Sequence, residues 1–197
     1  MNISKKGLAF IVDKETGGRA YYEKFLKHPT WPGLQSGVTI GVGYDLGYNT
    51  KEQFRKDWTE YLDSDELEVL SGFCGITGRA INLSSIRDIV VPWSFAVSVF
   101  NESTVPRFYR QLLSVYPEAD RLPPDAAAAL LSLVFNRGTA LKGDRRTEMV
   151  EIQAALKGGN LGEIPDLLRS MKRLWPETAG LRIRRDDEAA LFEKAIA

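Results

Sequence analysis

The fold is decided around residues 125–138, where the chain runs DAAAALLSLVFNRG. Almost every side chain in this stretch is apolar, so a helix formed by it would lack a polar face. A helix that is apolar on all sides is normally buried in the middle of a bundle. Pro124 suits the first turn of such a helix, and Gly138 suits its end. The sequence therefore predicts a buried helix over 124–137 with further helices packed around it.

Much of the chain outside this stretch also has helical patterns. Thr50 and Gln53 form a capping-box sequence for a helix that runs to about Leu62. Asp63 or Ser64 can cap the helix after it. Further helices, separated by Pro and Gly residues, are predicted near 78–88, 93–101, 104–116, 145–157, 161–174 and 181–195.

Residues 17–47 have a different texture. They are rich in glycine and contain short aromatic or β-branched pieces such as AYYEKF and GVTIGVGYDLG, so we expect short strands and turns with little helix. A first helix is predicted before them, with Ser4 as its N-cap and its end between Glu15 and Gly18.

These patterns predict an α+β fold that is mainly α and forms a single domain over 1–197. A smaller lobe over about 1–62 would hold the first helix, the β region and a connecting helix. A larger helical lobe would cover about 63–197. A small β element between a first helix and a helical body is a natural place for a cleft.

The composition limits the possible functions. The 197 residues carry 26 Lys plus Arg and 26 Asp plus Glu, a balance that argues against nucleic acid as a partner, since gripping it needs a basic surface. One cysteine, Cys74, permits no internal disulfide, and one histidine, His28, permits no zinc site of the usual Cys/His kind. No nucleotide motif is present, so we expect no metal and no cofactor.

We expect no membrane insertion and no classical signal peptide. No apolar run approaches the roughly 18 to 20 residues that span a bilayer. Near the N-terminus the apolar piece GLAFIV is short, ends at Asp13, and has no small-residue cleavage site after it. The protein would then be synthesised in the cytoplasm, and any export would need another route.

The residues best suited to chemistry are two carboxylates and a hydroxyl, Glu15, Asp45 and Thr39. Hydrolysis of a glycosidic bond uses one protonated carboxyl to donate to the leaving oxygen and one ionised carboxylate to activate water or attack the sugar. Apolar neighbours can keep a carboxyl protonated near neutrality. Taken alone, the same pattern also suits a surface glutamate and a turn-forming aspartate. The apolar residues that could keep one of these carboxyls protonated are Ile11, Val12, Tyr21 and Tyr22.

Four motifs in a fixed order add to this interpretation: GLAFIVDKETGG, VTIGVGYDLG, LLSLVFNRG and GLRIRRDDEAALF. Together they resemble the phage-type lysozymes, glycoside hydrolase family 24. That family has a helix ending in a catalytic Glu, a T-I-G-x-G turn, a buried helix ending in F-N-x-G, and a final Gly-Leu-x-x-Arg-Arg-x-x-Glu helix. The resemblance covers the whole chain and implies a lysozyme-like fold.

By this resemblance Glu15 is the general acid and Thr39 the catalytic threonine. The second acid departs from the T-even phage pattern, in which it follows the Glu by about nine residues. That position is Lys24 here, and the nearest acid is Glu23. In the pesticin-like branch the catalytic Asp instead follows the threonine by six residues, where this chain has Asp45. Asp45 is therefore the expected second acid, with Glu23 in reserve.

The resemblance implies a muramidase that hydrolyses the β-1,4 bond between N-acetylmuramic acid and N-acetylglucosamine in peptidoglycan. Glu15 would donate the proton while Asp45 and Thr39 position the attacking water, with inversion. If the two carboxyl groups instead lie about 5 Å apart, a covalent intermediate and retention are the alternative. A monomeric phage endolysin released by a holin and an antibacterial effector delivered by a secretion machine both fit, acting on periplasmic peptidoglycan. In the effector case a cognate immunity protein is expected. The alternatives are a peptidoglycan-binding module that does not cut and a plain helical interaction protein.

Expected substrate contacts come from two regions. Phe135 and Asn136 end the buried helix, a corner that faces the cleft in the resembling family, although core packing and capping are alternatives. Trp31 and Tyr44 lie in the β region. Trp93 and Trp175 are expected to pack within the protein. Arg182, Arg184 and Arg185 could form a patch for the anionic wall, but Asp186, Asp187 and Glu188 follow, and salt bridges on the helix face are the better expectation.

Overall fold

The computed structural model describes residues 1–78 and 81–197. It divides into two compact units: an N-terminal unit, Val12–Val105, and a C-terminal unit made of Met1–Ile11 with Pro106–Ala197. The lobes expected from sequence, divided near residue 62, do not coincide with these units. The start of the chain belongs with the C-terminal helices because Asn2 Nδ2 donates to the carbonyl of Leu122 at 2.7 Å and Lys6 pairs with Asp125 at 2.8 Å.

The fold class is α+β and mainly α, as expected. A two-stranded antiparallel sheet accompanies the helices in the part of the chain that the structure describes. No helix within the described residues is long and apolar enough to cross a membrane. Up to residue 105 the elements are α1 (Lys5–Thr16), α2 (Arg19–Phe25), β1 (Thr39–Ile40), β2 (Tyr44–Asp45), η1 (Leu46–Tyr48), α3 (Lys51–Trp58), α4 (Ser64–Ser71), α5 (Trp93–Val99) and the π-helical turn η2 (Phe100–Thr104). The elements that follow are α6 (Val105–Val115), η3 (Pro117–Arg121), α7 (Pro124–Arg137), η4 (Asp144–Arg146), α8 (Thr147–Gly158), η5 (Leu161–Glu163), α9 (Ile164–Ser170), η6 (Met171–Leu174) and α10 (Ala179–Ile196).

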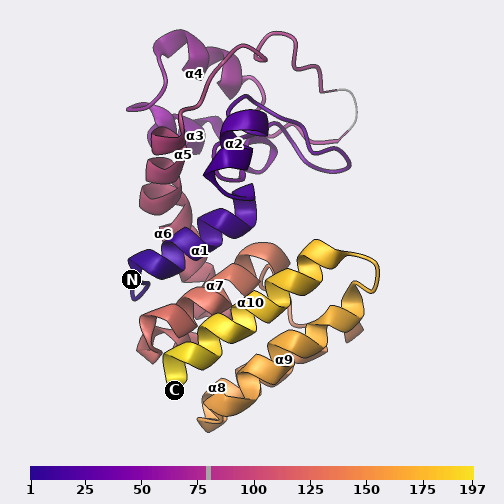
Figure 1. Cartoon of the computed structure of the whole chain (residues 1–197). Coiled ribbons are helices and arrows are strands. Elements are labelled where there is room, and N and C mark those ends of the chain that lie inside the picture. Colours follow the sequence, from indigo (N-terminus) through magenta and orange to yellow (C-terminus); the bar gives the residue numbers. More distant parts are fainter. Residues whose placement is uncertain (79–80) are drawn as a thin grey trace. The chain divides into compact units, whose positions relative to one another are not determined.

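The C-terminal unit is built around α7, which has the predicted bounds. Every residue from Ala126 to Val134 is buried, as the all-apolar pattern required. Helix α10 packs along α7 and α9, and α8 packs on α9 (Figure 1). Helix α1 approaches α7 closely at Gly7, where a Cβ would lie 2.4 Å from the Cβ of Ala128. The buried helix is therefore the centre of this unit.

Helix α10 also buries charge, so the salt bridges predicted along its face lie in the core. Arg184 and Arg185 are 6% and 0% exposed, and Glu188 is fully buried. Glu188 Oε1 accepts hydrogen bonds from the Ser132 hydroxyl at 2.6 Å, from Arg184 Nε at 3.1 Å and from Arg185 Nη2 at 3.0 Å. The expected ion pairs exist, but two of the three arginines cannot form a surface patch because they lie in the core against α7.

The N-terminal unit contains a helix that the sequence did not predict. The left-handed glycines Gly17 and Gly18 end α1, and α2 begins directly after them. Tyr22 of α2 is fully buried, donates its hydroxyl to the carbonyl of Val91 at 2.8 Å, and meets Trp93 edge-on with 5.2 Å between ring centroids. These contacts are made far along the chain, so the local glycine-rich pattern could not reveal a seven-residue helix.

One predicted helix is absent in the part that can be seen. Residues 79–80 of the predicted helix 78–88 lie outside the described residues, 81–83 have no regular structure, and 84–88 form turns. Asn82 turns the backbone by accepting the amide N–H of Ser84 on its side chain at 2.9 Å. Ile86 is nevertheless fully buried, which accounts for the apolar spacing that suggested a helix.

Candidate active site

The hairpin formed by β1 and β2 places Thr39 directly opposite Asp45, and Ile40 opposite Tyr44. The Ile40–Tyr44 pair is buried, at 1% and 3% exposure, while Thr39 and Asp45 are half-buried. Since directly opposite residues project to the same face of a sheet, the threonine and the aspartate share the more open face. The structure thus brings two of the three predicted catalytic residues together.

The strand register brings Thr39 and Asp45 close together. The amide of Leu46 donates to Val38 at 2.8 Å, whereas the backbone groups of Thr39 bond outward to Thr30 at 2.8 and 2.9 Å. Thr39 and Asp45 therefore form a non-hydrogen-bonded pair, the kind in which Cα atoms approach to about 4.5 Å and side chains lie closest.

The carboxylate of Asp45 is fixed by backbone amides. Its Oδ1 accepts from Gly47 N at 2.8 Å and from Gly37 N at 3.0 Å, and its Oδ2 accepts from Gly37 N at 3.2 Å. Asp45 is also the N-cap of η1, and its carbonyl accepts from the side chain of Asn49 at 2.7 Å. The turn-forming role that the sequence left open for this aspartate is therefore real, and any catalytic role would be additional.

Sequence reasoning missed the two glycines that hold this carboxylate. A Cβ on Gly37 would lie 2.5 Å from Asp45 Oδ1 and 2.5 Å from the nitrogen of Gly47. A Cβ on Gly47 would lie 2.6 Å from Thr77 Cγ2 and 2.9 Å from the Cα of Gly37. Only glycine fits at either place without movement. The sequence did contain a sign of it, because an aspartate two residues before a glycine is typical of a side chain that caps its own turn.

Burial raises the pKa of Asp45 above its ordinary value, and the amide hydrogen bonds from Gly37 and Gly47 act in the opposite direction because they favour the ionised form. A carboxylate has about four acceptor positions on its two oxygens. The amides occupy three of them, so Oδ2 retains capacity to accept a hydrogen bond from a water molecule.

Tyr44 is a core residue, which corrects its assignment as a substrate contact. Its hydroxyl donates to Asp57 Oδ2 at 2.9 Å, and its ring meets Trp58 edge-on with 5.6 Å between centroids. Gln53 binds the other carboxylate oxygen of Asp57 at 2.7 Å. This network fixes the buried face of the hairpin to α3, and a ring with 3% exposure offers no surface to a sugar.

Glu15 lies in the last turn of α1 and is half-buried. The helix ends directly after it, where Thr16 is buried and donates its hydroxyl to the carbonyl of Val12 at 2.7 Å. Gly18 N then donates to the Thr16 hydroxyl at 3.2 Å. The backbone around Glu15 is thus well determined, and Glu15 belongs to the same compact unit as Thr39 and Asp45.

The reserve acid and the tryptophan have different surroundings. Glu23 is on α2, with its side chain 44% exposed and 3.7 Å from Arg19 one helical turn earlier. Trp31 is half-buried and donates its indole N–H to the carbonyl of Ser36 at 2.9 Å, which fixes the ring while leaving part of it accessible. An exposed glutamate has neither the burial nor the fixed geometry of Asp45.

Phe135 and Asn136 belong to the C-terminal unit. Phe135 is half-buried and lies against Phe108 with 4.1 Å between ring centroids, and Asn136 is exposed and accepts from buried Arg185 at 3.2 Å. Both therefore have structural contacts of the kind weighed from sequence. Trp175 packs as expected, with the guanidinium of Arg137 over its ring at 4.9 Å.

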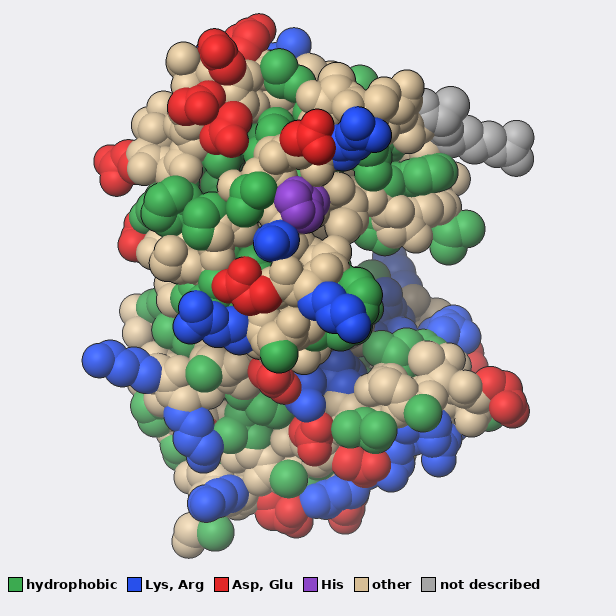
Figure 2. Space-filling view, turned by 45° about the horizontal axis from the view of Figure 1, so that its top comes forward, with side chains coloured by type: hydrophobic (Ala, Val, Ile, Leu, Met, Phe, Trp, Pro, Cys, Tyr) green, Lys and Arg blue, Asp and Glu red, His purple; other side chains and the backbone are tan. Residues whose placement is uncertain are grey.

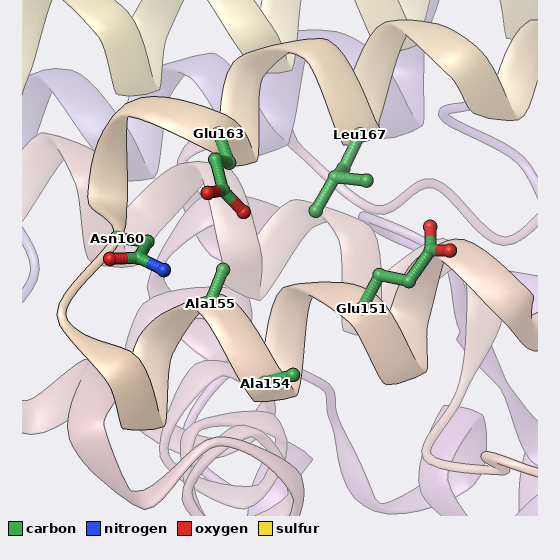
Figure 3. A pocket seen from close by; sticks show the side chains of 6 residues that line it. All are labelled: Glu151, Ala154, Ala155, Asn160, Glu163 and Leu167. Carbon is green, nitrogen blue, oxygen red and sulfur yellow. The ribbon is translucent and has the colours of Figure 1, made fainter.

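A separate hollow of about 430 Å³ lies between α8 and α9. Figure 3 shows Glu151 and Ala155 of α8 directed toward it, with Glu163 and Leu167 on its other side. Both glutamates are exposed, and the third polar residue that lines the hollow is the uncharged Asn160. Within 1–78 and 81–197, no three His, Cys, Asp or Glu residues gather as ligands for a metal ion.

Charged side chains of both signs are interspersed on the face seen in Figure 2, in keeping with the balanced composition. Comparison with protein-family models gives no match. Comparison with curated proteins gives none either. The candidate site therefore stands on its own residues.

Proposed function

We propose that the chain is a peptidoglycan hydrolase with a lysozyme-like fold, an N-acetylmuramidase in which Glu15 is the general acid. Asp45 and Thr39 would activate the attacking water, and the bond cleaved would be the β-1,4 link between N-acetylmuramic acid and N-acetylglucosamine. The observation that carries the proposal is the cross-strand pair of Thr39 and Asp45 on the half-exposed face of the hairpin. The sequence motifs supply the reaction class.

Each of the three residues has one role in the proposed reaction. Glu15 donates a proton to the leaving glycosidic oxygen, and the ionised Asp45 takes a proton from water as that water attacks the sugar carbon. The Thr39 hydroxyl, directly opposite, holds the water in line. Because two glycine amides fix the Asp45 carboxylate, it needs no rearrangement to act as the base.

A second candidate, a lysozyme-like module that binds peptidoglycan without cutting it, is favoured by one observation. The Asp45 carboxylate caps η1 and bonds Gly37, a structural task that would account for its presence without catalysis. The two candidates differ in whether bound wall is cleaved. Phage endolysin and delivered effector remain the two settings that fit either one.

Loss of turbidity of purified Gram-negative sacculi tests the proposal, using wild type, Glu15→Gln, Asp45→Asn and Glu23→Gln after circular dichroism confirms that all four fold. We expect wild type and Glu23→Gln to clear the suspension, and the other two variants to lose at least about 100-fold in rate, the usual scale for general acid–base catalysis. An inactive Glu23→Gln with an active Asp45→Asn would overturn the assignment of the second acid. Wild type that binds sacculi without clearing them would favour the binding module.

A further inference from the structure

A basic hollow in the C-terminal unit, unrelated to the hairpin, has the features of an anion site. It has a volume of about 400 Å³ and lies at the loop between α7 and α8. The loop turns at the left-handed glycine Gly143, after which η4 begins. The lining residues are Arg137, Lys142, Gly143, Asp144, Arg145 and Arg146.

The cations of this hollow outnumber the nearby carboxylates. Asp144 and Glu148 are both engaged by Arg173, which lies 2.6 Å from Glu148 Oε1, 3.2 Å from its Oε2 and 3.5 Å from Asp144 Oδ2. Within the described residues, no carboxylate forms an ion pair with the four lining cations. Those four are Arg137, Lys142, Arg145 and Arg146.

Arg137 is held in place at the wall of the hollow. Its guanidinium lies over the ring of Trp175 at 4.9 Å, and one of its amino groups donates to the carbonyl of Arg145. Burial is the largest cause that lowers the pKa of Arg137. Together with the neighbouring charges of Arg146, Arg185 and Arg145, and against an opposite effect of Glu148, it brings this pKa to about 10. The repulsion among these cations is what a bound anion would relieve.

We propose that this hollow binds a phosphate-type dianion, either free or as a monoester group of a larger molecule. A planar guanidinium donates two parallel N–H bonds to such an oxyanion, and a fixed one loses little freedom in doing so. A dianion also neutralises two of the four charges, where a monocarboxylate neutralises one. This inference does not rest on the proposed hydrolase activity, since its readout is binding.

The test is calorimetric titration of the whole chain at low ionic strength with inorganic phosphate, a small phosphate monoester and acetate. We expect saturable binding of phosphate with a Kd on the order of 1 mM, and much weaker binding of acetate. Monoester binding as tight as that of inorganic phosphate would support a phosphate group carried by a larger molecule. Binding of inorganic phosphate alone would support a free ion.

Variants localise the site without threatening the fold. Lys142 and Arg145 are exposed, so Lys142→Ala and Arg145→Ala should fold normally and weaken phosphate binding by about 5-fold each, the upper range for an exposed ion pair. Lys157→Ala and Arg110→Ala remove exposed cations elsewhere in the unit and should leave binding unchanged. Equal binding of phosphate and acetate, no phosphate binding by wild type, or full binding by the Lys142→Ala/Arg145→Ala double variant would overturn the proposal.

Discussion

Asp45 and Glu188 are two carboxylates that are removed from solvent to different extents and are stabilised by different partners. Glu188, in the C-terminal unit, is fully buried and accepts hydrogen bonds from two arginines and a serine. Asp45, in the N-terminal unit, is half-buried and is held by the amides of two glycines. Side-chain cations compensate the first and backbone dipoles the second. Only Asp45 is exposed enough to contact a substrate. A catalytic role is therefore proposed for the hairpin, and a structural role for the Glu188 cluster of α10.

The largest expected effect is at the buried cluster. Glu188→Gln removes the negative charge and leaves Arg184 and Arg185 buried in the core without it. Breaking a buried ion pair by neutralising one partner costs about 3–5 kcal/mol. Denaturant unfolding should show a loss of this size in the free energy of unfolding.

Glu177→Gln is the matched control, since Glu177 is exposed in the same unit and should change stability by less than about 0.5 kcal/mol. A loss as small as the control's in Glu188→Gln would mean that the arginines do not depend on this carboxylate. The two carboxylates would then not differ in the way described.

The next effect is steric and is centred on the hairpin. Gly37→Ala places a Cβ against Asp45 Oδ1 and Gly47 N, each 2.5 Å away. Such overpacking costs typically about 1–3 kcal/mol, and the fixed carboxylate must shift. Thermal unfolding should show the loss, and amide chemical shifts of Gly37 and Gly47 should change.

Gly180→Ala is the control for this change. Gly180 lies in the first turn of α10 with open space around it, so alanine should be neutral or stabilise by up to about 1 kcal/mol. Unchanged stability and unchanged amide shifts in Gly37→Ala would contradict the close packing around Asp45.

The pH dependence of stability distinguishes burial from hydrogen bonding at Asp45. Because burial raises the folded pKa above the ordinary value, the native state holds this proton more tightly than the unfolded chain. The stabilisation from the protonated form is present below the ordinary aspartate pKa and is lost as pH rises through the raised one. The Tm of wild type relative to Asp45→Asn should therefore fall across that window.

Asp88→Asn, at a side chain 91% exposed, should show no such trend. A wild-type Tm that rises relative to that of Asp45→Asn as pH increases would mean that the glycine amides outweigh burial at Asp45. The hydrogen bonds from Gly37 and Gly47 would then fully offset the cost of burying the Asp45 carboxylate.

The smallest effect on stability is expected at Thr39. Thr39→Val keeps the β-branched shape on the half-exposed face of the hairpin, so the free energy of unfolding should change by less than about 0.5 kcal/mol. Clearing of sacculi should nevertheless slow if the hydroxyl positions water. A variant with normal activity would remove Thr39 from the proposed mechanism, and one with a large stability loss would show a structural role for the hydroxyl.

The sequence predicted those features that short-range pattern determines. The all-apolar run gave the bounds of α7, and the N-caps at Thr50 and Asp63 are present, the latter as a capping box with Glu66. It also put the end of α1 at the correct place, beside Glu15.

The errors at α2, at Tyr44 and at Arg184 and Arg185 are cases in which residues far along the chain decide burial. Helix α2 depends on the contacts of Tyr22 with Val91 and Trp93, and no local pattern contains them. Tyr44 was predicted as a substrate contact in the β region, but Asp57 accepts its hydroxyl in the core. Arg184 and Arg185 have the composition of a surface, and they are buried because Glu188 and Ser132 meet them there.

The sequence pointed to Thr39 and Asp45 as candidate site residues, but it did not predict the contacts that hold them in place. Register could be inferred only once the strands were known, because Thr39 and Asp45 face each other through a one-to-one pairing that a slip by one residue would destroy. Gly37 and Gly47 are present in the sequence, but their close approach to each other and to the Asp45 carboxylate depends on the tertiary structure.

The most direct test of the central claim is the chemical identity of what wild type releases from purified sacculi, read by mass spectrometry. The proposed muramidase predicts soluble muropeptides with reducing N-acetylmuramic acid ends, absent from digests with Glu15→Gln. Sacculi that bind the protein and release nothing, or fragments that end in anhydro-muramic acid, would contradict it.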